Sequence, residues 1–216
     1  MLIAGIDEAG RGPCIGPLVL GVCVIDKKDE EKLVEIGVRD SKLLSVAERE
    51  RQFPLIKKAV TEFRTIHITA QEIDELMPRR SLNEIEAMYA GRLLNGLETR
   101  PNVVYVDSPD VVMGEFAVRI SKYVAFPVKI ISEHKADLNY PIVSASSIIA
   151  KVERDAEIKK ISEEFGNVGS GYPHDEITIR FLKNYLANHT IMPRFVRQSW
   201  QTINALQEEK FQKKLF

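Results

Sequence analysis

The feature that most constrains this 216-residue chain is a pair of adjacent carboxylates at the end of its first apolar run. Residues Leu2–Ile6 are apolar, Asp7 and Glu8 follow at once, and Gly10–Gly12 comes next with Arg11 at its centre. A short apolar run bounded by glycine indicates a buried strand. Carboxylates at the end of such a strand are costly to bury unless they are paired or bound to a cation. The pattern therefore predicts a cation site beside a flexible turn.

Five apolar runs predict the strands of an α/β sheet. They are Leu2–Ile6, Pro17–Ile25, Phe63–Ile68, Val103–Val106 and Val128–Ile131. The connection between the first two runs is too short for a helical crossover, so we expect them to form an antiparallel hairpin. The later runs alternate with helical patterns, which is typical of parallel crossovers. The sheet is therefore predicted to be mixed and five-stranded.

Three stretches carry apolar residues at steps of three and four and predict helices. They lie over Leu82–Leu93, Pro141–Ala156 and Ile177–Leu186. No strand pattern is evident after about Gly171. We therefore expect an α/β body over residues 1–173 and a C-terminal helical segment, residues 174–216, packed on it.

The composition sets broad limits on function. Apolar residues make up 44% of the chain, which is enough for a core, and the net charge is −1. No overall basic field indicates nucleic acid, but acidic clusters would cancel basic patches in this sum. Cys14 and Cys23 are too few for a zinc site or a disulfide framework, which fits a reducing, cytoplasmic compartment. The N-terminus carries Asp7 and no basic region, and Pro13–Ile25 is too short to span a bilayer, so no membrane role is expected.

Two further acids follow apolar strands. Asp107 closes the fourth run, and Asp137 comes shortly after the fifth. In open α/β sheets, ligands bind beyond the strand ends, where oxygen ligands suit Mg²⁺. Two such ions roughly 3.5–4 Å apart can activate a water and stabilise a leaving oxygen. Adjacent side chains on an ideal strand point to opposite faces, so Asp7 and Glu8 share an ion only if the strand ends or bends, or if Glu8 offers its backbone carbonyl.

Further motifs form an ordered set along the chain. Gly5–Pro13 is followed by Asp40–Lys42, Asp107, Glu133–Asp137, Val143–Asp155 and Gly169–Pro173. In these motifs and in their order, the chain resembles type 2 ribonuclease H, and its archaeal members most of all. The resemblance covers about residues 2–173. The C-terminal forty residues match more loosely, chiefly at Arg197–Trp200.

The resemblance implies an RNase H-like fold and an endoribonuclease that depends on Mg²⁺ or Mn²⁺. It implies cleavage of the RNA strand of RNA–DNA hybrids and incision 5′ of ribonucleotides embedded in duplex DNA, as in DNA replication and ribonucleotide excision repair. Carried over by position, the catalytic and metal-binding acids are Asp7, Glu8, Asp107 and Asp137. Asp7 would bridge two ions, Asp137 would help hold the ion that activates the water, and the other two would help hold the ion at the leaving 3′-oxygen. The products would carry 5′-phosphate and 3′-hydroxyl ends, and the enzyme would act as a monomer.

Two motifs have a functional and a plain structural interpretation. Gly10, Arg11 and Gly12 would form the loop that senses the ribose 2′-hydroxyl, or they form a hairpin turn that needs positive φ. Tyr172 would pack on the sugar at the RNA–DNA junction, or it is an ordinary packing residue of a tight turn. The four acids favour the functional interpretation of both.

The basic residues also leave two interpretations open. Lys42, Lys151 and Arg154 are expected to contact phosphate; otherwise they lie on solvated turns or helix flanks. In the C-terminal segment, we expect Arg194 and Arg197 to grip the substrate. At the C-terminus, Gln212, Leu215 and Phe216 faintly resemble a tail that binds a sliding clamp; the alternative is a frayed amphipathic helix end.

Two rival functions remain for a chain with this pattern. A DNA-junction nuclease of the same fold would use the same acids, but it would have no need of a loop that senses a 2′-hydroxyl. A non-catalytic nucleic-acid-binding protein would have no need of four intact acids. Both features therefore favour the ribonuclease.

Overall fold

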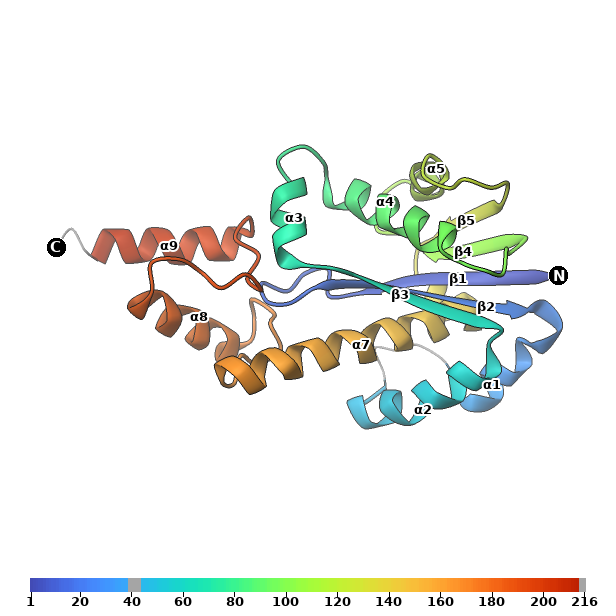
Figure 1. Cartoon of the computed structure of the whole chain (residues 1–216), viewed down its shortest axis with the longest axis horizontal. Coiled ribbons are helices and arrows are strands. Elements are labelled where there is room, and N and C mark those ends of the chain that lie inside the picture. The colour runs from blue at the N-terminus through green and yellow to red at the C-terminus, as the bar shows by residue number, and fades with distance from the viewer. Residues whose placement is uncertain (39–43, 214–216) are drawn as a thin grey trace. The chain divides into compact units, whose positions relative to one another are not determined.

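The computed structural model describes residues 1–38 and 44–213, with side chains up to residue 210 (Figure 1). The chain divides into two compact units. The first comprises Met1–Ala9, Val19–His67 and Ser81–Glu153; the second comprises Gly10–Leu18, Ile68–Arg80 and Arg154–Phe216. The chain passes between the two units several times, so neither unit is one continuous stretch of sequence.

The first unit is built on a five-stranded sheet in the order β3-β2-β1-β4-β5. Its strands are β1 (Leu2–Ala9), β2 (Leu18–Asp26), β3 (Glu62–Ile68), β4 (Val103–Asp107) and β5 (Lys129–Glu133). β1 is antiparallel to β2 and parallel to β4, and β4 is parallel to β5. The predicted hairpin, the mixed sheet and its five strands are therefore confirmed.

Strand β1 is longer than its apolar run predicted. Its pairing with β2 continues past Ile6 through Asp7–Gly21 and Glu8–Leu20 to Ala9–Val19. The antiparallel partner supplies hydrogen bonds as far as the turn, so the two carboxylates lie inside a strand instead of after it.

Helices cover both faces of the sheet (Figure 1). The helical elements of this unit are η1 (Lys27–Asp29), α1 (Glu31–Ile36), α2 (Val46–Ala59), α4 (Leu82–Asn95), α5 (Glu115–Ser121), α6 (Ala136–Asn139) and the first half of α7 (Pro141–Phe165). On one face, Ile3 and Cys23 of the sheet share a core cluster with Leu33 of α1, Ile56 of α2 and Ile149 of α7. On the other face, α4 packs against α5, and α5 contacts β5.

Glycines allow α7 to lie directly on the sheet. A Cβ on Gly5 of β1 would overlap the carbonyl of Ile142, and a Cβ on Gly21 of β2 would lie 2.6 Å from the carbonyl oxygen of Ser146. The Ser146 hydroxyl donates to the Gly5 carbonyl at 2.8 Å. The backbone of α7 therefore lies directly against that of β1, the strand that carries Asp7.

The second unit is mostly helical. It contains α3 (Ala70–Leu76), the second half of α7, α8 (Glu176–Asn188) and α9 (Gln201–Lys213). Ile15, Val168, Leu182, Met192 and Ile203 lie in its core cluster. Between Gly171 and Lys213, the described chain forms an isolated bridge from Val196 to Ile15 but no strand of the sheet. None of the helices in the described residues is long and apolar enough to cross a membrane.

Candidate functional site

The strand register brings Asp7, Asp107 and Asp137 to one edge of the sheet in the first unit. Ile6 of β1 pairs with Val106 of β4, so Asp7 and Asp107 follow at the same level on adjacent parallel strands. The Asp107 Oδ1 accepts the N–H of Ala136 at 2.8 Å, and Asp137 is the next residue, in α6. Segments far apart in the sequence thus deliver three of the predicted acids together.

Asp7 lies in a buried, polar environment. Its exposed fraction is 5%, and burial raises the pKa of its carboxyl group above the usual range. The charge of Lys151, a hydrogen bond from Ser147 and the Glu8 N–H at 2.7 Å oppose that rise, whereas the carboxylate of Asp137 adds to it. The Lys151 ammonium also donates to the Ser147 hydroxyl at 2.6 Å. Ser147 and Lys151, one turn apart on α7, therefore favour the charged form of Asp7, whereas the Asp137 carboxylate disfavours it.

The donor set of this edge fits a divalent cation. Asp137 is only 2% exposed, so Asp7 and Asp137, whose negative charges repel each other, are both removed from water. A bound cation would offset both the burial and the like-charge repulsion. Within residues 1–38 and 44–213, no three His, Cys, Asp or Glu side chains are already arranged to hold an ion. The structure thus brings the acids near one another without completing a metal site.

Glu8 differs from Asp7 in orientation. Because β1 pairs with β2 through both residues, their side chains point to opposite faces of the strand. Asp7 is buried and Glu8 is half-buried. The strand neither ends nor bends between the two residues, which leaves the backbone carbonyl as the way for Glu8 to reach an ion bound by Asp7.

The second unit brings together the loop of Gly10–Gly12, Arg154 and Tyr172. Gly10 has φ +85°, and a Cβ there would lie 2.6 Å from Cδ of Arg154, so both conformation and space require glycine. Gly12 is outside the left-handed region, and a Cβ on it would lie 3.7 Å from Cε1 of Tyr172. The predicted loop and the predicted aromatic residue are therefore neighbours.

The turn that carries Tyr172 is fixed from several directions. The Cys14 N–H donates to the Gly171 carbonyl at 2.7 Å, and the Ser170 N–H donates to Asp175 at 2.6 Å. Arg154 donates to the Ser170 carbonyl at 2.8 Å, and its guanidinium carbon lies 5.1 Å from the centre of the Tyr172 ring. The ring is half-buried, with one side supported by the cation.

The structure contradicts the phosphate-gripping role expected of Arg197. Its exposed fraction is 0%, and its Nε, Nη1 and Nη2 donate to the carbonyls of Gly16, Arg11 and Gly10 at 3.1, 2.9 and 2.5 Å. A side chain so placed cannot reach a phosphate. Arg194, three residues earlier, is exposed.

The remaining basic residues lie in different settings. Arg154 is 6% exposed, and Lys151 lies beside Asp7, so their contact with phosphate stays a prediction. Lys42 lies outside the described residues, as do the side chains of Gln212, Leu215 and Phe216.

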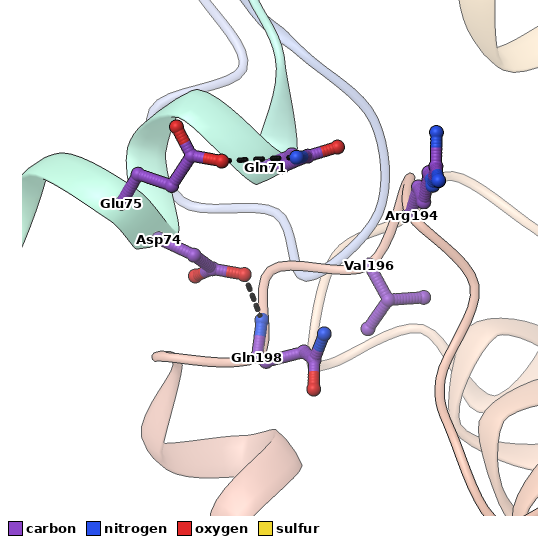
Figure 2. A pocket seen from close by; sticks show the side chains of 6 residues that line it. All are labelled: Gln71, Asp74, Glu75, Arg194, Val196 and Gln198. Carbon is purple, nitrogen blue, oxygen red and sulfur yellow. Dashed lines mark hydrogen bonds between the residues drawn. The ribbon is translucent and has the colours of Figure 1, made fainter.

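Figure 2 shows a pocket of about 350 Å³ in the second unit, between α3 and the chain that precedes α9. Its lining side chains are Gln71, Asp74, Glu75, Arg194, Val196 and Gln198. Gln71 donates to Glu75 at 2.9 Å, and Asp74 accepts the Gln198 N–H at 2.7 Å. Asp74 also accepts the Ser199 N–H at 2.9 Å, so it ties α3 to the residues that follow Arg197.

Sequence reasoning missed the contacts that Ser147 and Arg197 make in these arrangements, and the hydrogen-bond partner of Trp200. Ser147 lies four residues before Lys151 on a helix, a spacing that indicates that the two side chains meet. Trp200 donates its indole N–H to the Gly12 carbonyl at 3.2 Å. No local pattern marks a side chain whose partner is a backbone carbonyl almost 190 positions away in sequence.

Comparisons with known proteins identify the family of this chain. Residues 4–203 match the family model described as Ribonuclease HII. The Ribonuclease HII of Pyrococcus furiosus is 43% identical over 208 residues, which cover 96% of this chain and 92% of that protein. The crystal structure of the ribonuclease H2 from Pyrococcus horikoshii is 46% identical, with a TM-score of 0.92 over 99% of this chain and 100% of that chain.

A second solved structure, from the PCNA:RNase HII complex of Archaeoglobus fulgidus, is 38% identical. It gives a TM-score of 0.85 over 93% of this chain and 96% of that chain. The family model spans most of the sequence, and the relatives match over nearly their full lengths. The chain therefore belongs to the ribonuclease HII family of ribonuclease H hydrolases.

Proposed function

We propose that this chain is a metal-dependent endoribonuclease that hydrolyses the RNA strand of RNA–DNA hybrids and incises 5′ of single ribonucleotides in duplex DNA. The observation that carries the proposal is the buried pair of carboxylates, Asp7 and Asp137, at the strand edge that also presents Asp107. Buried like charges are unfavourable unless a cation joins them. Oxygen ligands at the end of an α/β sheet suit a hard cation.

We assign the site to Mg²⁺ or Mn²⁺, with Asp7, Glu8, Asp107 and Asp137 as the residues that would hold it. When bound, such ions activate a water and stabilise the leaving 3′-oxygen. The chain's own residues supply position. Ser147 and Lys151 hold the Asp7 carboxylate, and the Ala136 N–H holds that of Asp107.

Substrate choice is assigned to the second unit. Gly10, Arg11 and Gly12 form the proposed sensing loop. Gly12 is exposed and presents backbone without a side chain, which allows close approach to a sugar, whereas Gly10 is buried against Arg154. The 2′-hydroxyl both donates and accepts hydrogen bonds, and it is what distinguishes RNA from DNA. Tyr172, whose ring lies next to Gly12, would pack on the neighbouring sugar. Lys42, Lys151 and Arg154 are the proposed phosphate contacts.

The reaction we propose yields a 5′-phosphate and a 3′-hydroxyl. An enzyme of this kind serves DNA replication and the excision of ribonucleotides, and we propose that it works as a monomer in the cytoplasm. Residues 1–173 would hold all four acids, and residues 174–216 would be the C-terminal helical segment.

Three duplexes of one sequence test the proposal. One is an RNA–DNA hybrid, one is DNA with a single ribonucleotide, and one is all DNA. With Mg²⁺ we expect the first two to be cut and the third to remain intact, and with EDTA none should be cut. Cleavage of a branched all-DNA junction would instead identify a DNA-junction nuclease. Binding to all the duplexes without metal-dependent cleavage of any would identify a non-catalytic nucleic-acid-binding protein.

A sliding clamp is the proposed protein partner. The relative from Archaeoglobus fulgidus was solved in a complex with PCNA, and the C-terminus of this chain carries Gln212, Leu215 and Phe216. Deleting residues 211–216 should abolish clamp binding in a pull-down and leave cleavage of a short duplex intact. Loss of short-duplex cleavage in a folded variant would place the tail in the active site instead.

A further inference from the structure

The carbonyl groups of the Gly10–Gly12 loop are all held by the C-terminal segment within the second unit. Arg197 donates to Gly10 and Arg11 at 2.5 and 2.9 Å, and Trp200 donates to Gly12 at 3.2 Å. Arg197 is fully buried, and its guanidinium carbon lies 4.8 Å from the centre of the Trp200 ring. Two side chains that stack on one another therefore determine where the carbonyls of three successive residues point.

The direction of these carbonyls determines the direction of the loop N–H groups. The described chain has only trans peptide bonds. In a planar trans peptide, the C=O of one residue and the N–H of the next point in opposite directions. Because the Gly10 and Arg11 carbonyls point at Arg197, the N–H groups of Arg11 and Gly12 point away from it. The next residue, Pro13, has no N–H to add.

The holding segment is itself fixed on its other side. Asp74 of α3 accepts the N–H of Gln198 at 2.7 Å (Figure 2). It also accepts the N–H and the hydroxyl of Ser199 at 2.9 and 2.5 Å. The Arg197 N–H donates to the Cys14 carbonyl at 2.9 Å. The backbone from Arg197 to Ser199 is therefore held by the Cys14 carbonyl and by the Asp74 carboxylate, as a positioning role requires.

We propose that Arg197 and Trp200 are positioning residues for ribose recognition: they fix the Gly10–Gly12 loop so that its N–H groups face the 2′-hydroxyl of the substrate. The inference rests on the proposed function, because it assigns the loop to the ribose. It gives the C-terminal segment a part in specificity, in place of the phosphate grip that the sequence suggested for Arg197. Neither side chain touches the substrate.

The test separates ribose recognition from grip on the duplex. Trp200→Phe removes one hydrogen bond and keeps an aromatic ring, and Arg197→Lys keeps the charge but cannot reach three carbonyls. The matched control is Arg180→Lys, at an exposed arginine of α8 in the same unit. Two quantities are measured with Mg²⁺: kcat/KM on a duplex with one ribonucleotide, and the inhibition constant of the all-DNA duplex as a competitor.

We expect kcat/KM to fall about 5-fold in Trp200→Phe, as for the loss of one hydrogen bond, and at least about 50-fold in Arg197→Lys. The inhibition constant of the all-DNA duplex should stay within about twofold of wild type, since phosphate contacts dominate affinity. Arg180→Lys should leave kcat/KM unchanged. Thermal denaturation identifies a variant that does not fold. If Arg197→Lys does not fold, the test rests on the milder variant Trp200→Phe.

Two results would overturn the inference. One is an unchanged kcat/KM in Trp200→Phe; the other is a parallel loss of kcat/KM and of all-DNA affinity, which would mean that the segment only grips the duplex. If the wild-type protein does not cut the ribonucleotide duplex at all, the proposed function fails instead, and that outcome is seen before any variant is compared.

Discussion

At the scale of single residues, the proposed chemistry depends on Asp7 and Asp137, two acids that are both held out of water. Asp7 is buried beside Asp137, and Lys151 and Ser147 only partly compensate for the burial. The charged form of Asp7 is thus disfavoured in the fold. A bound cation would favour the charged form of such a carboxyl group.

The first prediction concerns Asp7→Asn. Removing the charge should reduce cleavage by several orders of magnitude, because the bridging ligand is lost. In EDTA, the variant should be at least as stable as wild type. The pKa of Asp7 is raised in the folded state, so the free energy of unfolding of the wild type falls as the pH rises above the unfolded pKa of about 3.9. The variant has no carboxyl group at this position and should not show this decrease. Urea denaturation at several pH values measures this pH dependence, and Glu98→Gln, at an exposed residue, is the control. Near-normal cleavage would contradict the bridging role.

A second residue, Asp175, behaves in the opposite way. It accepts hydrogen bonds from the Ser170 N–H and hydroxyl at 2.6 and 2.7 Å and from the Ile177 N–H at 2.9 Å. These bonds hold the pKa of its carboxyl group well below the usual range. The carboxylate therefore stabilises both the start of α8 and the turn that carries Tyr172.

The second prediction follows from that contact. Asp175→Ala should destabilise the protein by about 1 kcal/mol at pH 7, as for the loss of a helix cap. The stabilisation by a depressed pKa is present above the unfolded value of about 3.9 and is lost as the pH falls through the lower, folded value. The difference between wild type and variant, measured by thermal denaturation from pH 7 to pH 3, should therefore shrink toward acid. A difference that does not change with pH would show that the charge of Asp175 contributes nothing.

At the scale of elements, the position of Asp7 depends on how closely α7 approaches β1. Gly5 lets the carbonyl of Ile142 lie where a side chain would otherwise be, and Ser146 bridges the two elements. The same helix then presents Ser147 and Lys151 to Asp7. The helix–strand contact thus positions the site as well as the core.

The third prediction tests this contact. Gly5→Ala should destabilise the protein by about 1–3 kcal/mol, because the added methyl group forces α7 away from β1. Activity should fall as well, since Ser147 and Lys151 move with the helix. In Gly96→Ala, where the nearest atom would be 3.5 Å from the new Cβ, stability should change much less. Equal denaturation midpoints for the two variants would contradict the close contact.

Hydrophobic periodicity predicted the strands and helices α4, α7 and α8 well, and the short elements poorly. The patterns over Leu82–Leu93 and Pro141–Ala156 correspond to α4 and α7. Helices α1, α3 and α5 have six or seven residues each, too few for a periodic signal. Helix α2 was missed although its capping box, Ser45 and Glu48, is visible in the sequence.

The candidate site was predictable to the extent that side-chain chemistry marks it. Acids at strand ends are such a mark, and the register of β1, β4 and β5 then brings three of them to one edge. The end of β1 was not predictable from its apolar run, because the partner strand β2 sets it. The role of Arg197 was not predictable either, because backbone carbonyls carry no sequence signature.

At the scale of the whole molecule, the two compact units divide the work proposed here. The acids and Lys151 belong to the first unit; the Gly10–Gly12 loop and Tyr172 belong to the second. The second unit is assembled from three stretches of chain, and its core joins Ile15 and Val168 to residues of α8 and α9.

The fourth prediction concerns a truncation after residue 173. It leaves the four acids but removes the core residues Leu182, Met192 and Ile203, so that Ile15 and Val168 lose their packing partners. We expect a protein with low solubility and no cooperative thermal transition near that of the full chain. A truncated protein that unfolds cooperatively at the wild-type temperature would show that the C-terminal segment is dispensable for folding.

The central claim is that this chain cuts DNA at a ribonucleotide and reads the ribose to do so. The most direct test maps the ends produced from a duplex with one ribonucleotide, labelled on each side of it, in the presence of Mg²⁺. We predict a single cut on the 5′ side of the ribonucleotide, with a 3′-hydroxyl on the DNA fragment and a 5′-phosphate on the ribonucleotide. A cut on its 3′ side, a 2′,3′-cyclic phosphate end, or equal cutting of the all-DNA duplex would contradict the account.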